Sequence, residues 1–80
     1  MSAQAEQVLA ILRELRPDAD FAASADFVRD GLLDSFDIVA LVNELDARFR
    51  IAVRGADIVP ENFRSLAAIA GLVERSPGKG

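Results

Sequence analysis

The chain has 80 residues, of which 51% are hydrophobic, and its formal net charge is −4 at pH 7. This length allows one domain. The net negative charge argues against a nucleic-acid partner. The absence of cysteine excludes disulfides and thiolate metal sites. Because histidine and tyrosine are also absent and Lys79 is the only lysine, the usual general bases and nucleophiles are missing apart from carboxylates and serine, and we expect no catalytic activity of the chain's own.

The first predicted element is a helix that begins at the capping residue Ser2 and runs to about Arg16, where Pro17 ends it. Charged side chains such as Glu6 and Arg13 interrupt this segment, so it lacks the apolar stretch of a secretory signal peptide. No apolar run approaches the roughly 20 residues of a membrane span. We therefore expect a cytoplasmic protein. The apolar residues of the helix recur at helical spacing and form one stripe: Val8, Ile11, Leu12 and Leu15.

Residues 17–34 are predicted to form a long first loop, because several of them favour turns and caps over helices. The same stretch also carries apolar residues that a solvated linker would not need, namely Phe21, Phe27, Val28, Leu32 and Leu33. We therefore expect a loop held against the core, with a short helical turn near Phe27. Structureless loops of this length are uncommon in small domains and are often functional.

The second helix is predicted over Ser35–Phe49. Asp34 and Asp37 are three residues apart at its start and resemble a capping box, in which each side chain binds the other residue's backbone N–H. The apolar residues have the spacing of one buried helix face: Ile38, Leu41, Val42, Leu45 and Phe49.

The remaining segments complete a small bundle. Residues 51–53 are predicted to be an extended connector, Ala56–Val59 a short helical turn, and Phe63 a plug of the core. Ser65 is the expected cap of a last helix to about Arg75, and residues 76–80 are the expected flexible tail. The sequence thus predicts one all-α domain over residues 1–75, with three principal helices, a short third helix and a long first loop.

Ser35 is the candidate functional residue, because its hydroxyl lies at the start of a helix, after a long loop and between two aspartates. Phe36 and Val39 lie toward the edge of the buried stripe, and their exposure would suit a partner with an apolar groove. Two other interpretations stay open. In one, Ser35 is only the cap of a helical protein-interaction module; in the other, Asp34 and Asp37 are the paired carboxylates of a small enzyme, although nothing nearby would assist them.

The segment Gly31-Leu32-Leu33-Asp34-Ser35-Phe36 resembles the attachment motif of acyl carrier and peptidyl carrier proteins, which is usually centred on Asp-Ser-Leu. The resemblance extends over nearly the whole chain and includes the predicted second helix, its exit over residues 49–53 and the last helix. It implies an acyl-carrier-like four-helix bundle whose short third helix falls near Ala56–Val59. We also expect a monomeric carrier; chain length and Met1 favour a freestanding one, with a domain cut from a larger synthase as the alternative.

The resemblance further implies that Ser35 receives 4′-phosphopantetheine from coenzyme A in the active site of a separate phosphopantetheinyl transferase, and that Asp34 assists this encounter. The arm would hold acyl or aminoacyl cargo as a thioester. An acyl- or aminoacyl-activating ligase (an adenylation enzyme) would load it, and a downstream synthase or transferase would take it. By position along the recognition helix, the residues expected to contact partners are Phe36, Asp37, Val39, Asn43 and Glu44, with Phe63 from the other side.

The sequence departs from the family pattern at several positions. Phe36 replaces the usual leucine, and Ala40, Ala47 and Arg48 stand where fatty-acid carriers often have acidic residues. The motif and the Pro60–Phe63 loop are similar to D-alanyl carrier proteins and to freestanding aminoacyl carriers. These departures favour a role in specialised metabolism or aminoacyl transfer, with fatty acid synthesis as the alternative.

Overall fold

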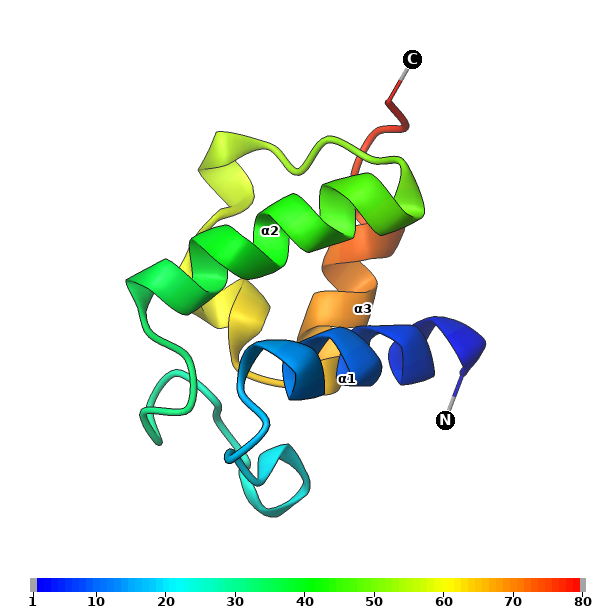
Figure 1. Cartoon of the computed structure of the whole chain (residues 1–80). Coiled ribbons are helices and arrows are strands. Elements are labelled where there is room, and N and C mark those ends of the chain that lie inside the picture. The colour runs from blue at the N-terminus through cyan, green and yellow to red at the C-terminus, as the bar shows by residue number, and fades with distance from the viewer. Residues whose placement is uncertain (1, 80) are drawn as a thin grey trace.

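The computed structural model describes residues 2–79, and within this range it contains three α-helices and no strand (Figure 1). The helices are α1 (Ala3–Leu15), α2 (Ser35–Phe49) and α3 (Leu66–Arg75). The prediction of a small all-α bundle is confirmed at this level. The bounds of the three principal helices agree with the sequence patterns to within a residue.

Each helix begins at a polar side chain that accepts a hydrogen bond from the first turn. Ser2 Oγ accepts from the backbone N–H of Ala5 at 3.1 Å, and Ser65 Oγ accepts from that of Ala68 at 3.1 Å. These caps satisfy backbone donors that have no partner inside the helix. The other end of α2 is closed by Arg50, whose φ of 53° is left-handed and stops the helical path.

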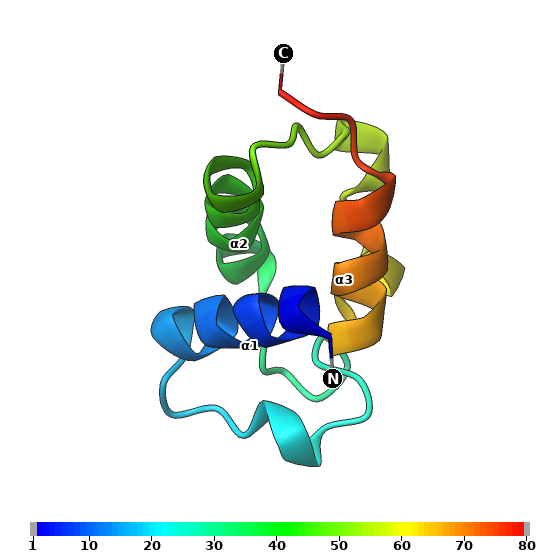
Figure 2. The same ribbon diagram turned by 90° about the vertical axis from the view of Figure 1, so that its right-hand side faces the viewer.

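The core lies where the three helices meet. α1 packs against both α2 and α3, and the long loop runs beneath α1 in both views (Figures 1 and 2). Side chains with almost no exposed surface come from every helix, so the three elements depend on one shared core. The largest of these are Phe63, Ile11, Leu12, Leu33, Leu41, Leu45, Ile69, Leu72 and Val8.

The long first loop is held against this core, as predicted. Phe21 and Phe27 are buried and meet edge to face, with ring centroids 5.0 Å apart. The backbone N–H of Phe27 donates to the carbonyl of Arg64 at 2.7 Å, which ties the loop to the entrance of α3. A 3₁₀ turn forms at Phe21–Ala23. The turn expected near Phe27 is also present, since the N–H of Asp30 donates to the carbonyl of Asp26 at 2.9 Å, although it does not extend into a helix.

The short helix predicted over Ala56–Val59 does not form as an α-helix. The structure instead has two successive 3₁₀ turns, Gly55–Asp57 and Pro60–Phe63. Pro60 occupies the first position of the second turn, where its missing N–H and fixed φ are tolerated, and it limits any helix that approaches from Ala56. Phe63 ends this segment and fills the core, as predicted.

The segment after α3, which was expected to be flexible, returns to the exit of α2. The N–H of Lys79 donates to the carbonyl of Arg50 at 2.8 Å, and the N–H of Ala52 donates to the carbonyl of Pro77 at 2.9 Å. These bonds frame an isolated antiparallel bridge between Ile51 and Gly78. No helix within the described residues is long and apolar enough to cross a membrane.

Candidate functional site

The N-terminus of α2 is held by a reciprocal pair of aspartates. Asp34 Oδ1 accepts from the backbone N–H of Asp37 at 2.9 Å, and Asp37 Oδ2 accepts from the backbone N–H of Asp34 at 3.1 Å. This is the capping box that the sequence predicts. Asp34 is therefore the N-cap, and Ser35 is the first residue inside the helix.

The hydroxyl of Ser35 is left without an intramolecular role. Among residues 2–79, the other serine hydroxyls all make hydrogen bonds: Ser2 and Ser65 cap helices, Ser24 donates to Asp30, and Ser76 donates to the carbonyl of Leu72. No hydrogen bond in this range involves Ser35 Oγ, and the residue is exposed. The site therefore presents a serine oxygen to solvent at a position fixed by the helix.

A salt bridge from α1 supports the capping box. Arg16, just after α1, donates from a guanidinium nitrogen to Asp37 Oδ2 at 2.9 Å, and the Asp37 side chain is 18% exposed. Partial burial raises the pKa of Asp37, but hydrogen bonds from the Asp34 backbone and from Arg16 outweigh it and lower this pKa below its ordinary value. Asp37 is thus ionised at neutral pH and is fully occupied in holding α2.

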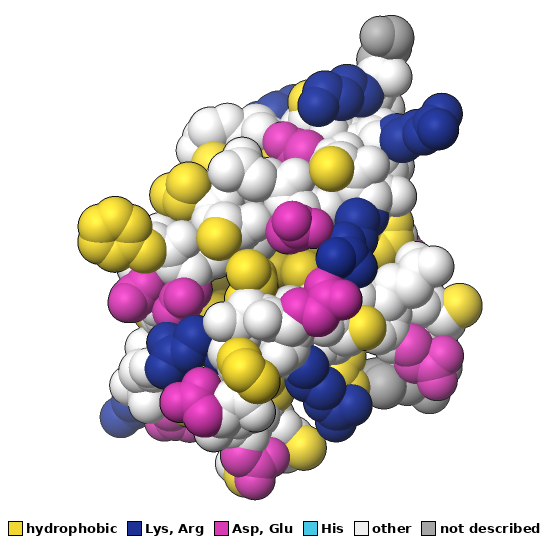
Figure 3. Space-filling model, in the orientation of Figure 1, with side chains coloured by type: hydrophobic (Ala, Val, Ile, Leu, Met, Phe, Trp, Pro, Cys, Tyr) yellow, Lys and Arg dark blue, Asp and Glu magenta, His cyan; other side chains and the backbone are white. Residues whose placement is uncertain are grey.

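Exposed apolar side chains surround Ser35. Phe36 is 86% exposed and Val39 is 58% exposed, which confirms that both lie outside the core. Ile58 and Val59 are also exposed, and we call these four residues the apolar patch. Figure 3 shows an apolar protrusion at the end of the molecule where α2 begins.

A shallow groove joins the patch to the serine. Its volume is about 220 Å³. Its lining connects the first turn of α2 with the connector between the two 3₁₀ turns, through Ser35, Ile38, Val39, Ile58, Val59 and Pro60. The serine hydroxyl thus stands at the edge of a largely apolar hollow.

The residues that were expected to contact partners differ in how far the structure exposes their side chains. Asn43 is exposed, but Glu44 is half-buried and accepts a hydrogen bond from Arg48 at 3.0 Å. The expectation for Phe63 is wrong, because its side chain has no exposed surface and cannot reach another protein. Phe36, Val39 and Asn43 are exposed, whereas Asp37 and Glu44 are partly buried and hold arginines.

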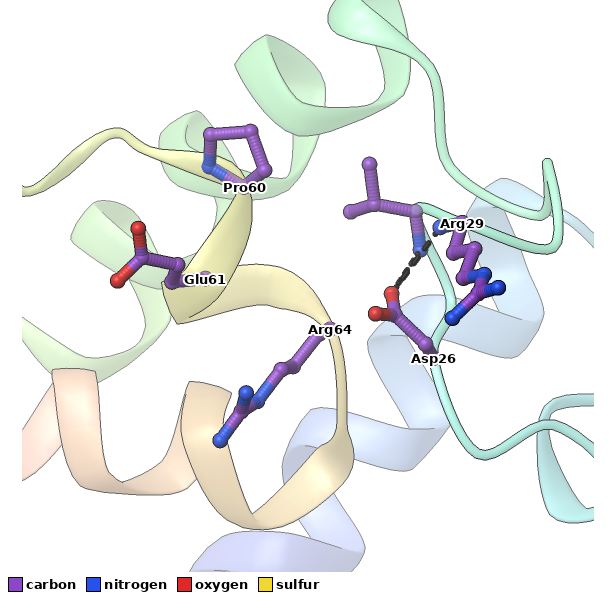
Figure 4. A pocket seen from close by; sticks show the side chains of 6 residues that line it. Asp26, Arg29, Pro60, Glu61 and Arg64 are labelled. Atoms are coloured by element: carbon purple, nitrogen blue, oxygen red, sulfur yellow. Dashed lines mark hydrogen bonds between the residues drawn. The ribbon is translucent and has the colours of Figure 1, made fainter.

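Another hollow, of about 240 Å³, lies on the far side of Pro60 from the serine groove. Figure 4 shows its charged rim, with Arg29 and Glu61 on opposite sides. The carboxylate of Asp26 accepts from the backbone N–H groups of Val28 and Arg29, at 3.2 and 3.0 Å. This carboxylate closes a loop turn, and the mixed charges around the hollow favour no single class of ligand.

Comparisons of the chain with protein-family models, with curated proteins and with solved structures gave no match. The functional argument therefore rests on the residues and the geometry of the site.

Some residues of the site were not predicted. Arg16 was considered only as the approximate end of the first predicted helix, and Ile58 and Val59 only as part of a turn. Arg16 and Asp37 are 21 positions apart in the chain, so their contact depends on how α1 lies against α2. The one sequence signal for Ile58 and Val59 was their apolar character in a segment that is otherwise turn-forming.

Proposed function

We propose that the chain is a carrier protein and that Ser35 is its site of attachment for 4′-phosphopantetheine. The observation that carries this proposal is the exposed hydroxyl of Ser35, which takes no part in the capping box on either side of it. A serine used only as a cap would accept a hydrogen bond from the first turn, as Ser2 and Ser65 do. Asp34 caps the helix instead.

The attachment step needs an enzyme from outside the chain. Ser35 Oγ attacks the β-phosphorus of coenzyme A, and the new oxygen–phosphorus bond forms as the bond from this phosphorus to the bridging pyrophosphate oxygen breaks. Adenosine 3′,5′-bisphosphate leaves with that oxygen, and the serine proton passes to a base of the transferase, which also holds Mg²⁺. The described residues contain no cluster of side chains suited to a metal ion. Asp34, beside the hydroxyl, assists the encounter with the transferase.

The acyl-carrier-like four-helix arrangement belongs to this proposal. The two 3₁₀ turns at Gly55–Asp57 and Pro60–Phe63 occupy the place in the chain of the family's short third helix. The same proposal includes a cytoplasmic, monomeric carrier that an adenylation enzyme loads and a synthase or transferase unloads. The pairing of Glu44 with Arg48 supports aminoacyl or specialised metabolism over fatty acid synthesis, whose carriers present a more acidic second helix.

The test is the intact mass of the chain after incubation with coenzyme A, Mg²⁺ and a promiscuous phosphopantetheinyl transferase. The parent protein should gain one phosphopantetheine, and Ser35→Ala should gain none. Ser24→Ala is the matched control, because it removes a different serine hydroxyl, in the long first loop, and should load normally. Absence of loading by several transferases, on folded protein that is not already modified, would refute the proposal.

A second candidate is a helical interaction module without a prosthetic group. The high exposure of Phe36 and Val39 favours it, because large apolar side chains in such positions often contact another protein. The same mass measurement separates the two functions, since a transferase would leave an interaction module unmodified.

A further inference from the structure

We propose that the enzyme that receives Ser35 recognises it by apolar contact with Phe36 and Val39, and that Asp37 and Glu44, which already hold arginines, contribute little. This inference rests on the proposed function, and its first partner is the phosphopantetheinyl transferase itself. The transferase must enclose the serine hydroxyl in its active site. It therefore covers whatever surrounds that hydroxyl.

The surroundings of Ser35 are apolar on two sides. Phe36 is the next residue in the chain, and Val39 lies one helical turn further along α2. Across the groove stand Ile58 and Val59, which are 39% and 37% exposed. An enzyme surface that covers the hydroxyl thus removes these side chains from water, and burial of large apolar side chains is the main source of binding free energy at such contacts.

The carboxylates of α2 and its cap are already engaged within the chain. Asp37 is bonded by Arg16 at 2.9 Å and Glu44 by Arg48 at 3.0 Å, so each carries a cation beside it. Arg48 also reaches Glu14 of α1 at 2.6 Å. The remaining two carboxylates bind backbone N–H groups: Asp34 that of Asp37, and Asp46 that of Val53 at 3.0 Å.

Arginines thus compensate the charges of Asp37 and Glu44, whereas Asp34 and Asp46 keep theirs. Figure 3 shows acidic and basic side chains interleaved over the face formed by α1 and α2, with no uniformly acidic stripe. A basic enzyme surface would compete with Arg16 for Asp37 and with Arg48 for Glu44. The same surface can reach Phe36 without displacing any residue.

The experiment measures the KM of a phosphopantetheinyl transferase for the carrier, with coenzyme A and Mg²⁺ saturating. Phe36→Ala should raise this KM about tenfold or more with little change in kcat, because it removes contact area without touching the hydroxyl. Phe36→Leu is the matched control that keeps an apolar side chain, and it should lie close to the parent. For the parent, KM should change less than about twofold between about 0.05 and 0.5 M NaCl, because salt screens charge but not apolar contact.

The outcomes separate this inference from the proposed function. A KM that rises steeply with salt, or a Phe36→Ala variant that loads with the parent's KM, would overturn apolar recognition while leaving the carrier function intact. Failure of the parent to load would overturn both. If sedimentation velocity shows that the parent alone forms a dimer that Phe36→Ala abolishes, the patch serves a second copy of the chain and the inference is wrong.

Discussion

Separate replacement of Asp34 and Ser35 tests which residue caps α2. Asp34→Ala removes the acceptor of the 2.9 Å bond from the Asp37 N–H, and the loss of an N-cap costs about 1 kcal/mol, within a range of roughly 0.5–2 kcal/mol. In a domain of this size, 1 kcal/mol corresponds to a fall in Tm of roughly 4–8 °C. Ser35→Ala removes an exposed hydroxyl without a partner, so the free energy of unfolding should change by less than about 0.5 kcal/mol.

The assay is thermal and urea unfolding followed by circular dichroism. Asp34→Asn serves as the control, since asparagine caps a helix about as well as aspartate and should keep the parent's Tm. The reasoning fails if Ser35→Ala lowers Tm as much as Asp34→Ala does. In that case the serine hydroxyl would be the cap, and the main reason to regard it as available for attachment would be gone.

Three further predictions concern stability. Hydrogen bonds lower the pKa of Asp37 below its unfolded value of 3.8, so the contribution of Asp37 to the free energy of unfolding is complete above about pH 4 and is lost as pH falls through the folded pKa. In acid titrations Arg16→Gln should therefore begin to unfold at a higher pH than the parent, and coincident unfolding curves would contradict this. Phe63→Ala should cost about 3–5 kcal/mol, a large part of the stability of a small domain, whereas an unchanged urea midpoint would remove Phe63 from the core. Arg50→Gly should raise the free energy of unfolding by up to about 1 kcal/mol by relieving the left-handed φ of 53°, and a lower Tm would show that the arginine side chain stabilises the turn.

The helices were predictable because their signals are local. The bounds of α2 follow from the Asp34–Asp37 spacing and from an apolar stripe that ends at Phe49, all within one stretch of chain. The loop before α2 was also predictable in part, since its phenylalanines needed a core to bury them. Local patterns of this kind place a helix without knowledge of what packs beside it.

Other features depend on contacts between distant segments. Phe63 was expected both to plug the core and to contact partners, and only the packing of the 3₁₀ turn against α3 shows that it is buried. The return of Lys79 to Arg50 joins two segments that carry no strand pattern. Residues 55–63 form 3₁₀ turns and not an α-helix. Gly55 and Pro60 indicate that any helix here is short, but they do not show whether its hydrogen bonds are of the α or the 3₁₀ type.

The division of roles at the start of α2 explains how so small a domain can leave a serine hydroxyl exposed and unbonded without loss of stability. Asp34 and Asp37 satisfy the end of the helix, Arg16 binds Asp37 from the residue just after α1, and Leu41 is buried in the core. Ser35 contributes to none of these contacts, so a group bonded to its oxygen displaces no side chain and breaks no hydrogen bond. The unpaired N–H groups and positive dipole end of the helix also favour an anion such as a phosphodiester at this position. In the proposed carrier, attachment and folding would therefore be energetically separate, so that the same fold could serve before modification, after it, and with each cargo.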